Sequence, residues 1–105
     1  MAVVSVTTLT VKPDRYEDFL VDARKIKAVI ERLGAKNVRL MAALVAGEAT
    51  GTFAFIGEAD DFAAYGAVQD KLLADPEAQP ILASANTSAG PATAAQTTVW
   101  VDVPL

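Results

Sequence analysis

The stretch V-V-S-V-T-T-L-T-V-K-P-D-R-Y-E-D-F-L, residues 3–20, joins a strand pattern to a helix pattern. Its first nine residues are rich in β-branched side chains and alternate with polar ones, which predicts a strand over residues 3–11. Residues 12–14 interrupt this pattern. From Pro13 the apolar residues recur every three or four positions, and Gly34 is placed to end the resulting helix.

Three further strands are predicted after this helix. Residues 37–46 are largely apolar and predict the second strand, and residues 47–51 hold the glycines of a hairpin connection. Residues 52–58 predict the returning strand of that hairpin. Residues 96–103 alternate clearly and predict the final strand.

A second helix is expected between the last two strands. One of the aspartates at 60–61 is expected to cap it, and the helix should run to about Ala74. A short helical turn follows, with Asp75 as its N-cap, Pro76 at its first position and Pro80 keeping it brief. The buried side of the second helix is expected to comprise Phe62, Tyr65, Val68, Leu72 and Leu73.

The predicted order βαββαβ is the ferredoxin-like arrangement of the α+β class. It places two helices on one face of a four-stranded antiparallel sheet. Residues 84–95 are small and polar without periodicity, so we expect a mobile loop that is a candidate lid. We expect residues 1–105 to form a single domain, because a chain of this length supports one modest core.

The composition removes several kinds of chemistry. The chain is 52% apolar but has no histidine and no cysteine, so it cannot by itself supply an imidazole base, a thiolate nucleophile or a histidine-ligated haem. The net charge of −4 argues against a nucleic-acid partner. Neither a signal peptide nor an apolar run near the ~20 residues of a membrane span is present, so we expect a cytoplasmic protein without a membrane partner.

Both faces of the predicted sheet carry apolar residues. Two helices cover one face only, and four strands of about 20 Å would leave roughly 400 Å² of the other uncovered. This flat projected area already lies within the ~300–600 Å² that is typical of the largest apolar patch on a soluble monomer. The side chains that project from the sheet add further area. We therefore expect a homodimer that pairs two sheets face to face. The alternative is a monomer in which residues 84–95 fold across the sheet.

Three segments resemble dimeric α/β-barrel proteins. V-T-T-L-T-V-K-P-D-R-Y-E-D-F-L, residues 6–20, resembles the opening of that superfamily. G-T-F-A-F-I-G-E-A-D-D-F-A-A-Y, residues 51–65, and A-D-P-E, residues 74–77, resemble its later half. The resemblance spans nearly the whole chain and implies two protomers that pack their sheets into a barrel. It also implies a cleft between sheet and helices in each protomer.

The superfamily includes cofactor-free monooxygenases of the antibiotic-biosynthesis type, haem-degrading enzymes and stress-responsive barrels. Its haem-binding members use histidine, which this chain lacks, so we expect no haem and no other cofactor. Three functions remain open: a barrel that binds a small apolar or aromatic molecule, a cofactor-independent monooxygenase or isomerase acting on an aromatic polyketide-like substrate, and a structural dimeric interaction module. Whether the chain is an enzyme is left open.

Four residues are candidates for ligand binding: Asn37, Arg39, Tyr65 and Trp100. Arg39 could stabilise an enolate or a carboxylate, or it could be an edge residue that reaches solvent or pairs with Asp102. Trp100 could stack on a ligand or lie in a dimer core, and Tyr65 could be a core residue with its hydroxyl at a rim.

No catalytic residue is assigned. The adjacent aspartates at 60–61 are explained by a helix start, so no metal site is expected.

Overall fold

The computed structural model describes residues 2–85, 87 and 90–105. Along the chain its elements are β1 (Val3–Val11), the 3-10 turn η1 (Pro13–Arg15), α1 (Tyr16–Arg32), β2 (Lys36–Ala42), the 3-10 turn η2 (Gly47–Ala49), β3 (Phe53–Ala59), α2 (Phe62–Ala74), α3 (Ala78–Ala85) and β4 (Ala92–Val101).

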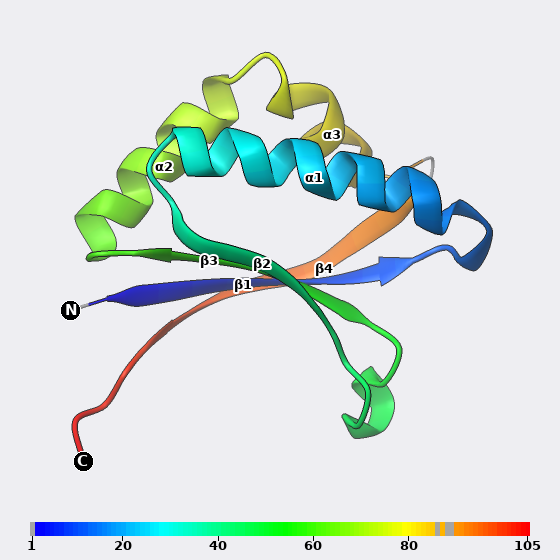
Figure 1. The fold of residues 1–105 in the computed structure, drawn as a ribbon, viewed down its shortest axis with the longest axis horizontal. Coiled ribbons are helices and arrows are strands. Elements are labelled where there is room, and N and C mark those ends of the chain that lie inside the picture. Colours follow the sequence, from blue (N-terminus) through cyan, green and yellow to red (C-terminus); the bar gives the residue numbers. More distant parts are fainter. Residues whose placement is uncertain (1, 86, 88–89) are drawn as a thin grey trace.

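The four strands form one sheet in the order β2-β3-β1-β4, and each neighbouring pair is antiparallel. This order is that of the ferredoxin-like fold, so the predicted α+β class and the βαββαβ arrangement are confirmed. Figure 1 shows α1, α2 and α3 on one side of the sheet. The other side, which we call the open face, has no α-helix over it.

A third helix, α3, stands where only a brief turn was predicted. Pro80 lies in the first turn of α3, where a missing backbone N–H does not interrupt the helix, so the helix continues to Ala85. The expectation that Pro80 keeps this piece short is therefore wrong.

Several predicted boundaries are also corrected. β2 ends at Ala42 rather than at residue 46, and the following Leu44 and Val45 are exposed at the end of the hairpin. β4 begins at Ala92 and ends at Val101, so residues 84–85 and 92–95 of the predicted loop belong to α3 and β4. Residues 86, 88 and 89 of that loop lie outside the described residues.

A bulge in β4 accounts for the missed start of this strand. Thr8 of β1 pairs with Gln96, but the next residue, Leu9, pairs with Ala94. One residue of β4 is therefore extra at this point, and the alternation of the two faces shifts by one. The helix-facing residues are Thr97, Val99 and Val101 after the bulge and Ala92 and Ala94 before it.

The core between sheet and helices is built around Leu9, Phe19 and Ala92. Phe19 of α1 and Phe53 of β3 place their ring centroids 5.5 Å apart in a tilted contact. Farther along α1, Val29 is buried with 2% exposure. These contacts hold α1 across the sheet.

The open face mixes apolar and polar side chains. It carries Val4 and Val6 of β1, Ile56 of β3, Met41 of β2 and Trp100 of β4, with threonines between them. Trp100 is 62% exposed and Met41 is 51% exposed. The hairpin between β2 and β3 and the C-terminal tail both curve away from the helices on this side (Figure 1).

No helix within the described ranges has both the length and the apolar character needed to cross a bilayer.

Candidate functional site

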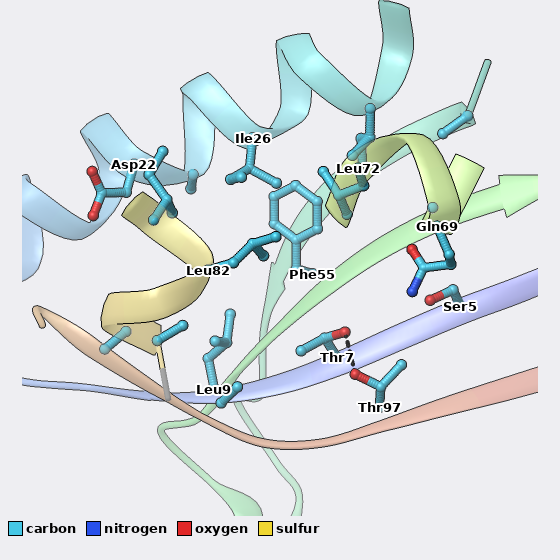
Figure 2. A pocket seen from close by; sticks show the side chains of 18 of the residues that line it. Ser5, Thr7, Leu9, Asp22, Ile26, Phe55, Gln69, Leu72, Leu82 and Thr97 are labelled. Atoms are coloured by element: carbon cyan, nitrogen blue, oxygen red, sulfur yellow. Dashed lines mark hydrogen bonds between the residues drawn. The ribbon is translucent and has the colours of Figure 1, made fainter. Parts of the chain in front are cut away.

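A cavity of about 310 Å³ lies between the sheet and the helices. Residues of β1, β3 and β4 form its floor, and residues of α1, α2 and α3 form its walls and roof (Figure 2). Its volume is at the lower end of the ~300–1,000 Å³ typical of small-molecule sites.

The greater part of the cavity wall is apolar. Phe55 rises from β3 into the middle of the cavity, with Ile26 of α1 above it and Leu82 of α3 beside it (Figure 2). Leu9 and Leu72 extend the apolar wall on the floor and on α2. The cavity is therefore suited to an apolar or aromatic body.

Polar side chains gather in one part of the cavity. Ser5 and Thr7 of β1, Thr97 of β4 and Gln69 of α2 lie near one another in Figure 2. Oγ1 of Thr7 and Oγ1 of Thr97 are 2.8 Å apart and share a hydrogen bond. The two threonines are direct cross-strand partners, so the sheet register itself places this pair.

Two capped helices hold the roof of the cavity in place. Asp61 Oδ1 accepts a hydrogen bond from the backbone N–H of Ala64 at 2.8 Å, which confirms the predicted cap of α2. Asp75 Oδ1 accepts from the backbone N–H groups of Glu77 and Ala78 at the start of α3. Tyr65, Val68 and Leu72 of α2 line the cavity.

The remaining part of the prediction for α2 is wrong. Phe62 and Leu73 were expected on its buried side, but they are 60% and 68% exposed. Phe62 stands in the first turn and Leu73 near the end of the helix.

An ion pair joins α1 to the segment before α3. Arg32 Nη2 lies 2.6 Å from Asp75 Oδ2. The hydrogen bond from Arg32, aided by those from the backbone of Ala78 and Glu77, holds the pKa of the Asp75 carboxyl below its ordinary value. Asp75 is 8% exposed, so this carboxylate is buried but fully hydrogen-bonded.

Two of the predicted ligand-binding residues lie together at the β2 edge of the sheet. Arg39 Nη1 is 3.0 Å from Glu58 Oε2, and Asn37 Nδ2 donates to the same oxygen at 2.7 Å. Asn37 has a φ of 52°, in the left-handed region that asparagine tolerates better than most residues. The alternative partner considered for Arg39, Asp102, is replaced by Glu58.

The other two predicted residues lie elsewhere. Tyr65 lines the cavity, while Trp100 stands on the open face of β4, at the opposite edge of the sheet from Arg39. Trp100 Nε1 donates to Thr98 Oγ1 at 2.8 Å. The structure thus brings Asn37 and Arg39 together but separates both from Tyr65 and Trp100. A ligand-binding role for the four remains a prediction.

Sequence reasoning missed the polar residues of the cavity floor. Thr7 lies in a strand whose helix-facing positions also include Leu9, and a threonine there is an unusual choice for a packed core. The position of Thr7 in this pattern could therefore have indicated a cavity. Thr97 could not have been assigned in the same way, because the bulge changes which residues of β4 face the helices.

In the described part of the chain, no group of three or more acidic, histidine or cysteine side chains is arranged to hold a metal ion.

Comparison with known proteins gives matches among solved structures only. No protein-family model matches the sequence, and no curated protein matches it. A protein from Deinococcus radiodurans assigned to the antibiotic biosynthesis monooxygenases has a TM-score of 0.70 and 15% identity, over 98% of this chain and 94% of that chain. A variant of SnoaB, a cofactor-independent oxygenase from Streptomyces nogalater, has a TM-score of 0.63 and 20% identity, over 99% of this chain and 95% of that chain.

A NIPSNAP family protein from Agrobacterium tumefaciens is similar as well, with a TM-score of 0.66 and 12% identity, over 99% of this chain and 86% of that chain. The matches span nearly the full length of the chains compared. They show that this chain shares the ferredoxin-like fold of these antibiotic biosynthesis monooxygenase-like and NIPSNAP proteins. That fold is the one that the sequence predicted.

Proposed function

We propose that this protein is a homodimeric barrel that binds a small apolar or aromatic molecule in the cavity between sheet and helices. The observation that carries the proposal is the cavity itself, which has a volume of about 310 Å³ and is lined by an apolar wall and a few polar groups. A purely structural interaction module would need no such space and would gain stability from filling it.

The homodimer is supported by the open face. Met41 and Trp100 present apolar surface there, with 51% and 62% of their side chains exposed, and none of α1, α2 and α3 lies over this face. The exposed Leu44 and Val45 on the β2–β3 hairpin extend the apolar surface beyond the strands. A second copy that packs its own open face against this one removes both surfaces from water.

Ligand binding is tested with a neutral fluorescent probe, N-phenyl-1-naphthylamine, titrated into the purified protein. We expect saturable fluorescence enhancement that Ala23→Leu weakens, because Ala23 lines the cavity and leucine would occupy part of it. Ala28→Leu is the matched control, since Ala28 lies on an exposed part of the same helix. Thermal unfolding of both variants reports whether they remain folded. If a folded Ala23→Leu variant gave the same titration as the wild type, the probe would bind outside the cavity, and the proposal would be contradicted.

A cofactor-independent monooxygenase is the second candidate. The similarity to SnoaB, which is described as a cofactor-independent oxygenase, favours this activity. Tyr65 is the cavity residue with a phenolic proton, so Tyr65→Phe is the first variant to compare with the wild type. Oxygen uptake with an anthrone-type substrate supports this candidate if Tyr65→Phe lowers the rate. If no oxygen is taken up with any of a panel of quinols, the monooxygenase candidate is rejected and the ligand-binding proposal remains.

A further inference from the structure

The polar side chains of the cavity floor indicate which ligands the cavity accepts. We infer that Ser5, Thr7, Gln69 and Thr97 form a neutral polar subsite that binds an uncharged oxygen of the ligand, a hydroxyl or a carbonyl, and that the cavity rejects anionic ligands. This inference rests on the proposed ligand-binding function and adds the class of ligand to it.

The hydrogen-bonding capacity of the subsite is only partly used. The Thr7–Thr97 bond consumes one hydroxyl proton of the pair and leaves the second proton and several lone pairs available. The side chains of Ser5 and Gln69, both half-buried, make no hydrogen bond to another described residue. The subsite therefore offers donors and acceptors together, and a hydroxyl or a carbonyl can use them.

The remaining wall fixes how such a ligand lies. The apolar side chains of Ile26, Phe55 and Leu82 occupy the part of the cavity away from Gln69 and Ser5 (Figure 2). A ligand with one polar end and an apolar or aromatic body would place its oxygen at the threonine pair and its body against Phe55.

The charges around the cavity argue against an anion. Among the described residues that line it, none is a lysine or an arginine, so the cavity has no cation to pair with an anionic ligand. Two acidic residues also line it: the side chain of Glu58 lies on the open face, bonded to Arg39 and Asn37, and Asp22 lies on the far side of the cavity from the subsite (Figure 2). A carboxylate or phosphate at the threonine pair would lose its hydration without gaining a counter-charge.

Displacement of N-phenyl-1-naphthylamine by matched naphthalenes at pH 7.5 tests this inference. We expect 2-naphthol to displace the probe at a concentration at least about tenfold lower than 2-naphthoate, in line with about 1.4 kcal/mol for the uncompensated charge. Equal displacement by naphthol and naphthoate would overturn the neutral subsite while leaving the proposed function intact. If neither the probe nor any naphthalene binds, the proposed function fails first.

The double variant Thr7→Val, Thr97→Val tests the subsite at the level of residues. Valine keeps the shape and the strand preference of threonine, so we expect about a fivefold to tenfold loss of affinity for 2-naphthol and little change for naphthalene. Thr10→Val, Thr93→Val is the matched control, because Thr10 and Thr93 are cross-strand partners in the same two strands but face the other way. Equal losses for naphthol and naphthalene would indicate a change in the cavity as a whole and would overturn the subsite.

Discussion

Arg32 Nη2 lies 2.6 Å from Asp75 Oδ2, so one ion pair joins the end of α1 to the segment between α2 and α3. The other oxygen of the same carboxylate accepts hydrogen bonds from the backbone N–H groups of Glu77 and of Ala78, the first residue of α3. A single buried side chain therefore holds the helix that closes one side of the cavity.

The charge of Asp75 should stabilise the fold in a pH-dependent way. Its pKa in the folded protein lies below the ordinary value of 3.8, so the stabilisation is complete above that value and is lost as the pH falls through the lower, folded-state pKa. We expect Asp75→Asn to lower the melting temperature at pH 7, with the difference from the wild type shrinking in acid. Asparagine keeps an acceptor for the backbone N–H groups of Glu77 and Ala78, so the change removes the charge and the acceptor that face Arg32 but leaves the cap.

Asp60→Asn is the control for this prediction. The hydrogen bond from Lys36 lowers the pKa of Asp60 as well, but both partners are largely exposed and water screens their attraction. We expect a smaller change of melting temperature than in Asp75→Asn. Equal changes in the two variants would show that burial of Asp75 adds nothing to its ion pair.

The cap of α2 predicts a second measurable effect. Replacing Asp61 with alanine removes the acceptor of the Ala64 N–H and should lower the free energy of unfolding by about 1 kcal/mol. Asp61→Asn keeps an acceptor at this position and should cost only a fraction of that amount. Urea unfolding followed by circular dichroism measures both, and similar losses in the two variants would point to charge rather than capping.

Two glycines should respond in opposite ways to alanine. A Cβ at Gly90 would lie 2.8 Å from the backbone oxygen of Ser84, so Gly90→Ala should destabilise the protein by about 1–3 kcal/mol through crowding. A Cβ at Gly66 meets nothing within 4 Å, and the residue lies inside α2, so Gly66→Ala should stabilise the protein by about 0.5–1 kcal/mol. Urea unfolding of the two variants checks the pair. A Gly90→Ala variant as stable as the wild type would mean that the chain around Ser84 can move aside.

The proposed homodimer can be followed through Trp100, which is the single tryptophan of the chain. Its side chain is 62% exposed in one protomer and would be covered by a second sheet. We expect its emission to shift to shorter wavelength, and its quenching by acrylamide to fall, as protein concentration rises through the dissociation constant. Sedimentation equilibrium should give twice the 11.0 kDa of one chain.

Val6→Lys should shift this equilibrium toward the monomer. Val6 lies on the open face of the central strand β1, where a lysine would bury a charge without a partner in the dimer. Ala28→Lys adds the same charge to an exposed part of α1 and should leave the mass unchanged. A mass near 11.0 kDa at every concentration of the wild-type protein would reject the dimer.

The sequence was sufficient for the βαββαβ order, because each of the four strands and the two longer helices, α1 and α2, has its own local signal. The β-branched run of residues 3–11 and the capping aspartate Asp61 determine local structure with little help from distant residues. Boundaries were less reliable where tertiary contacts decide them. Leu44 and Val45 have the composition of a strand, but they lie beyond the pairing of β2 with β3.

The site was harder to predict than the fold. Arg39 and Trp100 attracted attention because their side chains are chemically distinctive, yet they lie on the open face and away from the cavity. Thr7 and Thr97 are 90 positions apart in sequence, and their significance comes from lying opposite each other in two paired strands. Such a pairing depends on register, which a single sequence does not reveal.

The extra residue of β4 has a consequence for mutational scanning. Even-numbered positions face the helices before it, at Ala92 and Ala94, and odd-numbered positions do so after it, at Thr97 and Val99. Sensitivity to charged substitutions along this strand should therefore change parity at residue 95. If the sensitive positions were all odd-numbered or all even-numbered along the whole strand, β4 would run without a bulge.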